Sequence, residues 1–240
     1  MTVDAQTAGF KFHSALERTA LLELYTSEGC SSCPPAEAWL SRLRDSPRLW
    51  REFAPVAWHV DYWNQLGWKD PWSAAEFSDR QRTYAQRWHD DNIYTPCFIL
   101  NGQEWRGWVA GQDGPPASRD RAGRLTVVSK DTNRWQAVFM PEGMAATRYE
   151  IHAAVLAGGI RSDVKAGENR GRRLNHDFVA LNLLQVEMAL DSGVAQGEFR
   201  LDPSSFRSEK VLALTIWVTR DGQLEPLQAT GGWLIPPAQK

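Results

Sequence analysis

Residues 21–40 read Leu21-Leu-Glu-Leu-Tyr-Thr-Ser-Glu-Gly-Cys-Ser-Ser-Cys-Pro-Pro-Ala-Glu-Ala-Trp-Leu40. An apolar run typical of a buried strand leads through a polar turn and Cys30-Ser-Ser-Cys33 into an expected helix. At a helix N-terminus the backbone N–H groups and the helix dipole favour a thiolate over a thiol. Two cysteines three positions apart at such a junction can face each other. The segment therefore predicts a dithiol that cycles to a disulfide.

The C-x-x-C pattern alone also fits half of a zinc site or a structural disulfide. No second C-x-x-C and no H-x3-H pair is present in the sequence to complete a zinc site. We therefore expect a redox-active Cys30–Cys33 disulfide, with no metal and no further cofactor. The third cysteine, Cys97, is expected to be a small buried residue. The alternative is that Cys97 joins Cys30 and Cys33 around a soft metal such as Cu(I).

Three further residues are expected to serve the dithiol. Pro96 opens a strand directly after Thr95, and beside a dithiol we predict a cis peptide bond that presses the proline ring against the sulfurs. The backbone of Thr95 would then pair with an extended substrate; an ordinary strand-initiating proline is the alternative. Glu23 lies in an otherwise apolar strand. It is either a buried acid that takes the proton of Cys33 or a solvent-facing residue at a sheet edge.

Composition and charge narrow the class of protein. The chain has 240 residues, 42% of them hydrophobic and 23% charged, which is typical of a soluble globular protein with room for two small domains. A formal charge of −2 without a Lys/Arg cluster argues against a nucleic-acid surface. The sequence contains no run of 18 apolar residues, so it predicts no membrane span. The first residues lack the features of a signal peptide, so we expect a cytoplasmic protein, with the periplasm as the alternative if an N-terminal segment was removed.

The first half of the chain predicts an α/β domain. Residues 1–19 are expected to form an N-terminal arm, and residues 20–123 the domain that carries the C-x-x-C motif. The expected elements are a strand at 20–25, a helix from Pro34 to about Arg44, a strand at 55–62, a helix at 75–89, and strands at 94–100 and 103–109 joined by an Asn101-Gly102 turn. This order predicts a parallel strand pair with antiparallel strands added to it.

The second half predicts a different architecture. Residues 110–123 are rich in turn formers and are taken as the domain boundary. Short strand candidates follow, at 125–128, 134–139, 149–156, 177–190, 197–201, 211–218 and 223–235. Their spacing predicts an antiparallel β-sandwich-like domain over residues 124–240. The expected fold class is therefore α/β plus all-β.

Four motifs together resemble a known family of bacterial proteins. They are Glu23-Leu-Tyr-Thr-Ser-Glu-Gly-Cys-Ser-Ser-Cys-Pro-Pro-Ala36, His59-Val-Asp-Tyr-Trp-Asn-Gln-Leu-Gly-Trp-Lys-Asp-Pro71, Tyr94-Thr-Pro96 and Gly167-Glu-Asn-Arg-Gly-Arg172. In combination they look like the thioredoxin-like family catalogued as domain of unknown function family 1223. The resemblance implies an N-terminal thioredoxin-like domain with a C-terminal β-sandwich-like portion, and it implies no particular activity.

The resemblance to the wider thioredoxin superfamily implies roles for single residues. Cys30 corresponds to the attacking cysteine, Cys33 to the resolving cysteine and Pro96 to the cis proline. Glu23 falls near the buried acid of the superfamily, with one extra residue intervening. The Ser-Ser dipeptide between the cysteines matches neither the Gly-Pro of reductants nor the Pro-His of strong oxidants, so the redox direction stays open.

Supporting roles are predicted for a wider set of residues, namely Tyr25, Asp61, Trp63, Cys97, Glu168 and Asn169. Asp61 ends the second expected strand and is a weaker candidate for the buried acid, whereas His59 is expected to pack or to make a simple hydrogen bond. Glu168 and Asn169 belong to a charged loop between glycines that can fold over a neighbouring site and bind an acidic or peptide-like group. The alternative for that loop is a solvated turn.

Three hypotheses for function follow. The first is a thiol–disulfide oxidoreductase that acts on a protein or small-molecule thiol through Cys30 and Cys33. The second is a protein that binds or delivers a soft metal, copper in particular, with Cys30, Cys33 and Cys97. The third is a non-catalytic binding module built on a thioredoxin fold.

Overall fold

The computed structural model describes residues 9–143, 147–206 and 211–237. Residues 1–8 of the expected N-terminal arm lie outside this range. Within the arm, β1 (Lys11–His13) pairs with a strand of the second half of the chain, β6 (Gly123–Ser129). No helix in the described ranges has the length and apolar character needed to cross a membrane.

The elements around the C-x-x-C motif follow the predicted order. They are β2 (Ala20–Thr26), α1 (Pro34–Arg42), β3 (Phe53–His59), α2 (Ala75–Arg87), β4 (Cys97–Leu100) and β5 (Gln103–Glu104). β2 and β3 are parallel, as predicted, and every residue of both is buried. Parallel strands covered on both faces have such continuous apolar runs.

The predicted hairpin is present but shorter than expected. Asn101 and Gly102 both have positive φ, 49° and 86°, as a type I′ turn between β4 and β5 requires. β4 begins only at Cys97, directly after the Thr95-Pro96 segment, and β5 ends at Glu104 because the chain then turns back.

Strands make up the rest of the chain. They are β6, β7 (Arg134–Pro141), β8 (Tyr149–Gly158), β9 (Ile160–Asp163), β10 (Arg173–His176), β11 (Val179–Ala180), β12 (Leu184–Asp191), β13 (Val194–Arg200), β14 (Val211–Arg220) and β15 (Gln228–Ile235). The strand expected over residues 177–190 is divided into β11 and β12. The β9–β10 hairpin was not predicted.

The expected fold class, an α/β thioredoxin-like domain plus an antiparallel β-sandwich-like domain, is wrong. The described residues form one mixed sheet of thirteen strands, together with the separate β9–β10 pair and only two α-helices. β11 connects the halves, since Val179 lies opposite Ala57 of β3 in parallel and opposite Ala157 of β8 in antiparallel register. Hydrogen bonding therefore runs without a break between the halves. A domain boundary between residues 123 and 124 stays a prediction.

The two hydrophobic cores both draw on strands of the second half of the chain. β8 and β14 are buried almost throughout, and their alternating side chains supply both cores. Leu156 and Trp217 pack in the core beneath β2 and β3, whereas their neighbours Val155 and Val218 pack in the second core. The two cores thus share the same strands.

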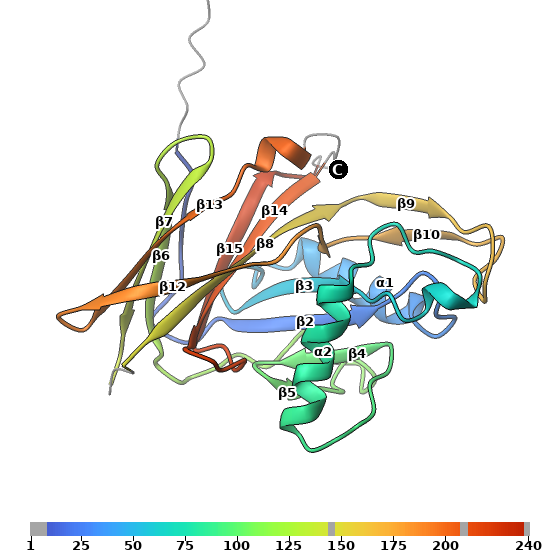
Figure 1. Ribbon diagram of the computed structural model, residues 1–240, viewed down its shortest axis with the longest axis horizontal. Coiled ribbons are helices and arrows are strands. Elements are labelled where there is room, and N and C mark those ends of the chain that lie inside the picture. Colours follow the sequence, from blue (N-terminus) through green and yellow to red (C-terminus); the bar gives the residue numbers. More distant parts are fainter. Residues whose placement is uncertain (1–8, 144–146, 207–210, 238–240) are drawn as a thin grey trace, which may run out of the picture.

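The two helices lie on opposite faces of β2. Glu23 bonds to Arg80 of α2, whereas Thr26 bonds to Glu37 of α1. Residues an odd number of positions apart in a strand point to opposite faces. On its outer side α1 contacts β10, so the β9–β10 hairpin covers the helix that carries Cys33 at its N-cap (Figure 1).

Candidate functional site

The two motif cysteines lie at the junction of β2 and α1. Ser27 turns the chain after β2, its carbonyl accepting the backbone N–H of Cys30 at 3.1 Å. Cys33 is the N-cap of α1, and its carbonyl accepts the first N–H groups of the helix from Ala36 and Glu37. Pro34 at the first helical position needs no partner for an N–H group, which is why the helix begins there. Both cysteines are buried free thiols.

The two thiols have different pKa values because their surroundings differ. A hydrogen bond from Cys33 is the largest cause that lowers the pKa of Cys30 to about 6, against the opposing effect of burial. Ser32 adds a contact, its Oγ lying 3.3 Å from the Cys30 sulfur. Burial raises the pKa of Cys33 well above its usual value, and the hydrogen bond with Cys30 raises it further. One cysteine is thus a thiolate near neutral pH and the other a thiol.

The Thr95–Pro96 peptide bond is cis, as predicted, and lies beside the dithiol. The Cys30 thiol points at the carbonyl oxygen of Thr95 over 3.7 Å. Gln81 of α2 fixes the segment by donating a hydrogen bond to the carbonyl of Tyr94 at 2.8 Å. Hydrogen bonding with the Thr95 side chain also acts to lower the pKa of Cys30.

Glu23 is buried, but its interactions are with α2 and not with the dithiol. Arg80 donates to its Oε2 at 2.7 Å and to its Oε1 at 3.2 Å, and Tyr84 donates to Oε1 at 2.6 Å. Trp58 also donates to Oε2, at 2.9 Å. Both carboxylate oxygens are therefore occupied, and no hydrogen bond joins Glu23 to Cys33 within the described residues. The ion pair with Glu23 in turn raises the pKa of Arg80, despite the opposing effect of burial.

A different acid, Glu37, approaches Cys33, and the sequence analysis missed it. Thr26 donates its hydroxyl to Glu37 Oε1 at 2.5 Å, and hydrogen bonding with Thr26 acts to lower the pKa of Cys33 against the larger effect of burial. The second oxygen of Glu37 contacts His176 Nδ1, and His176 Nε2 lies 3.1 Å from Glu28 Oε1. A line of buried polar groups thus leads from Cys33 through Thr26 to Glu37.

The charges along this line stabilise one another. Burial acts to raise the pKa of Glu37, but the charge and hydrogen bond of His176 outweigh burial and lower it. Burial acts to lower the pKa of His176, but Glu37 and Glu28 raise it to about 10. Glu37 is therefore an anion held beside the Thr26 hydroxyl. One sequence signal points to it: Glu37 follows Cys33 by four positions, and so lies one helical turn further along the same face of α1.

Two further polar side chains complete the buried group behind the dithiol. His59, at the end of β3, lies with Nδ1 2.8 Å from Asp70 Oδ2. Asp70 also accepts the backbone N–H of Glu28 at 2.8 Å. One ligand atom each from Glu37, His59 and His176 lies within 4.8 Å of the others, which is the spacing of a metal-binding group. Cys30, Cys33 and Cys97 form no such group in the described part of the chain.

The charged loop between β9 and β10 lies over the dithiol turn. Asn169 is fully buried and donates its Nδ2 to the carbonyls of Glu28 and Cys30 at 2.9 and 2.8 Å. Glu168 accepts the backbone N–H of Ser31 at 3.0 Å. The structure thus brings both predicted loop residues to the C-x-x-C turn.

The other predicted supporting residues surround the site at a greater remove. The Tyr25 hydroxyl donates to Glu23 at 3.3 Å, and Asp61 accepts a hydrogen bond from Ser78 of α2 at 2.5 Å. Trp63 packs closely on Gly29: a Cβ atom added to Gly29 would lie 3.1 Å from the Cβ atom of Trp63. Cys97 lies opposite Tyr25 in the sheet, and burial raises its pKa to about 12.

Comparison with protein families matches residues 21–219 to the model described as "Protein of unknown function (DUF1223)". The chain belongs to the DUF1223 family. A comparison of this DUF1223 chain with curated proteins gave no match.

Two solved structures are similar to this DUF1223 protein in fold. One is a structural-genomics crystal structure of a protein from Agrobacterium tumefaciens, with a TM-score of 0.65 and 21% identity, covering 93% of this chain and 97% of that one. The other is HBP35 of Porphyromonas gingivalis, with a TM-score of 0.61 and 13% identity, covering 95% of this chain and 79% of that one. At these identities the similarity concerns the fold alone.

The site of this DUF1223 protein therefore combines three features. The Cys30 sulfur, with its lowered pKa, contacts a protonated Cys33. In its thiol form Cys30 donates to the Thr95 carbonyl at the cis Thr95–Pro96 bond, and the buried Glu37 anion accepts the hydroxyl of Thr26. Such an arrangement can carry out nucleophilic exchange at sulfur, because the thiolate attacks and the thiol is deprotonated only when it is needed.

Proposed function

We propose that this DUF1223 protein is a thiol–disulfide oxidoreductase that acts on a protein or small-molecule partner through Cys30 and Cys33. The observation that carries the proposal is the contact of the Cys30 thiol with both Cys33 and the Thr95 carbonyl of the cis peptide bond. The combination of a C-x-x-C motif at a helix start with a cis proline also supports a relationship of the site to the thioredoxin superfamily. The thirteen-stranded sheet lends no support to that relationship.

The exchange has two steps. The Cys30 thiolate attacks a partner disulfide, so that one bond forms between Cys30 and a partner sulfur and the other partner sulfur leaves as a thiolate. Cys33 then loses its proton and attacks the Cys30 sulfur, which releases the second partner thiolate and forms the Cys30–Cys33 disulfide. The partner gains two electrons and the protein loses two, and the reverse sequence oxidises a partner dithiol.

The second step needs a base for Cys33, and Glu37 supplies it. The proton passes from the Cys33 sulfur to the Thr26 oxygen while the Thr26 proton passes to Glu37 Oε1. The short hydrogen bond between Thr26 and Glu37 supports this path. The lowered pKa of Glu37 keeps the carboxylate unprotonated and able to accept a proton, although it also makes Glu37 a weaker base. Glu37 thus takes the role that the sequence assigned to Glu23.

Reduction of insulin disulfides by dithiothreitol, and alkylation of the reduced protein, test the proposal. We expect the wild type to catalyse the reduction and Cys30→Ser to abolish it, because no attacking thiolate remains. Cys97→Ala is the matched control, since it removes a cysteine without removing the exchange pair. A wild type that never forms a Cys30–Cys33 disulfide, or full activity in Cys30→Ser, would contradict the proposal.

The reduction potential gives the direction. A lowered pKa of the attacking cysteine stabilises the reduced form and raises the potential. With the pKa of Cys30 at about 6, we expect a potential between those of thioredoxin, about −270 mV, and the oxidant DsbA, about −120 mV. Equilibration with glutathione redox buffers measures it, and a value outside this interval contradicts the link between the pKa and the potential.

A further inference from the structure

Glu37, His59 and His176 form a second cluster of chemically active side chains, and the dithiol exchange explains only the part that Glu37 plays. The three residues come from three separate elements, α1, β3 and β10, and all are buried. One ligand atom of each lies within 4.8 Å of the others. The two imidazole rings are 5.2 Å apart between centroids and nearly perpendicular, at 80°.

One atom of this cluster has no partner. The Nδ1 atom of His59 is held by Asp70, but its Nε2 atom has no hydrogen-bond partner among the described residues. The His59 side chain is fully buried, with an exposed fraction of 0%. A buried polar atom without a partner is unfavourable, and a bound ion or water is one way to satisfy it.

The other polar atoms of the two histidines and the glutamate each have a buried hydrogen-bond partner. Asp70 holds His59 Nδ1, Glu28 lies 3.1 Å from His176 Nε2, and Thr26 donates to Glu37 Oε1. A metal-binding histidine typically has its other ring nitrogen paired with a carboxylate or a carbonyl, which fixes the ring orientation. Here both histidines have a buried carboxylate in that position.

The charges of the cluster also suit a cation. Three buried carboxylates meet here, on Glu28, Glu37 and Asp70. Their ion pairs in the described residues are with the two histidines, and none is with a lysine or an arginine. A divalent cation would compensate these charges in a site from which water is largely excluded.

We propose that Glu37, His59 and His176 bind one first-row divalent cation of the zinc class. The ligand atoms are Glu37 Oε2, His59 Nε2 and His176 Nδ1, and the ion replaces the direct contact between Glu37 and His176. Two imidazoles and one carboxylate are a known ligand set for Zn²⁺, and they leave a fourth position open. Since Thr26 bonds Oε1, the two uses of Glu37 involve different oxygens.

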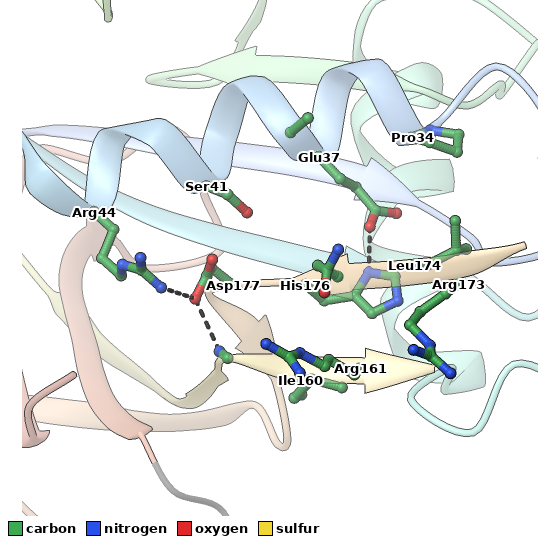
Figure 2. A pocket seen from close by; sticks show the side chains of 13 residues that line it. Pro34, Glu37, Ser41, Arg44, Ile160, Arg161, Arg173, Leu174, His176 and Asp177 are labelled. Atoms are coloured by element: carbon green, nitrogen blue, oxygen red, sulfur yellow. Dashed lines mark hydrogen bonds and ion pairs between the residues drawn. The ribbon is translucent and has the colours of Figure 1, made fainter. Parts of the chain in front are cut away.

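The ion has a route into the cluster. A surface pocket of about 500 Å³ lies between α1 and the β9–β10 hairpin, and Glu37 and His176 form part of its wall. Figure 2 shows Glu37 pointing down from the helix toward His176 on the strand below it. The inner ligand, His59, lies behind this pair, at the end of β3.

Titration of the metal-free full-length protein with Zn²⁺ tests the proposal. After dialysis against a chelator, we expect calorimetry to give one equivalent bound. The variant Cys30→Ser/Cys33→Ser/Cys97→Ser should retain that equivalent, because no sulfur is a ligand. His59→Ala and Glu37→Ala should each weaken binding at least tenfold. His152→Ala is the matched control, since it removes a buried histidine that stacks on Trp217 outside the cluster.

X-ray absorption of the zinc-loaded wild type keeps the proposal testable if these variants fail to fold. We expect only nitrogen and oxygen scatterers, at about 2.0–2.1 Å, and no sulfur at about 2.3 Å. Sulfur ligands, no binding by the wild type, or unchanged binding in a folded His59→Ala would each overturn the proposal. These measurements do not use the insulin assay, so a negative result for the metal site does not contradict the dithiol exchange, and the reverse also holds.

Discussion

The neighbouring Cys33 thiol is the largest cause of the acidity of Cys30, ahead of hydrogen bonds with Ser32 and Thr95. Because the hydrogen bond from Cys33 is the largest cause that lowers the pKa of Cys30, Cys30 of the reduced protein should be a thiolate above about pH 6 and a thiol below it. We expect the rate of Cys30 alkylation by iodoacetamide to rise with pH through a midpoint near that value. Cys33→Ala removes the donor and should move the midpoint toward the ordinary value of about 8.5. Mass spectrometry of the Cys30 peptide measures the rate, and an equal midpoint in both proteins would contradict this cause.

The proton path through Thr26 can be separated from the ion pair of Glu23. Thr26→Val removes the hydroxyl and keeps the shape of the side chain, so we expect attack by Cys33 on a Cys30 mixed disulfide to slow at least tenfold. Rapid-quench decay of that mixed disulfide measures the rate. An unchanged rate would remove Thr26 and Glu37 from the proton path.

Glu23→Gln is the matched test on the other face of β2. It breaks the buried pair with Arg80, so we expect the free energy of unfolding to fall by about 3 kcal/mol. The rate of attack by Cys33 should stay unchanged, because the interactions of Glu23 are with α2 and not with the dithiol. Urea unfolding measures the first quantity and rapid quench the second. A slower attack with normal stability would return the role of base to Glu23.

Sequence spacing predicts only the part of the site that is local in the chain. Cys30 and Cys33 are neighbours in one turn, and Glu37 lies one helical turn beyond Cys33, so helical spacing alone can place all three. His176 meets Glu37 from 139 positions away, on a strand of mixed polarity that periodicity did not predict. No local sequence pattern predicts the contact between Glu37 and His176, because it depends on how the β9–β10 hairpin folds over α1.

At the scale of elements, the loop between β9 and β10 contacts the C-x-x-C turn, and we expect it to limit access to the dithiol. Asn169→Ala would remove the side-chain donor of the buried Glu28 carbonyl and leave the Cys30 carbonyl with the backbone N–H of Cys33, at a cost of about 2 kcal/mol in unfolding free energy. We expect Cys30 alkylation at fixed pH to accelerate several-fold as the loop loosens. Glu168→Gln keeps an acceptor for the Ser31 N–H and should change neither quantity. Urea unfolding and alkylation rates give the two readouts, and equal rates in both variants would contradict the covering role.

The elements themselves were predicted where one strong signal marks them. Pro34 and Pro35 mark the start of α1, and Asn101-Gly102 marks the turn of the β4–β5 hairpin. β9 and β10 are four residues each and carry arginine, aspartate and asparagine, so their composition is that of a loop. Their pairing with each other, rather than strand propensity, makes them strands.

At the scale of the molecule, the error in fold class has a definite source. Hydrophobic periodicity identifies strands but not their neighbours, and the connection through Val179 joins segments that are remote in sequence. β8 and β14 looked like core strands of a separate sandwich. These two strands are instead buried almost throughout because each contributes side chains to both cores.

The shared strands predict cooperative unfolding. Trp217 of β14 lies 6.3 Å from Trp58 of β3 between ring centroids, and Arg80 of α2 lies 5.3 Å from the Trp217 ring. A fragment of residues 20–123 would lose this tryptophan together with β11 and the side chains of β8 that fill its core. We therefore expect the whole chain to unfold in one transition by both circular dichroism and tryptophan fluorescence, and the fragment to remain unfolded in water. Two separated transitions, or a fragment with native-like dispersion in its NMR spectrum, would show that residues 20–123 form an independent domain despite the shared core.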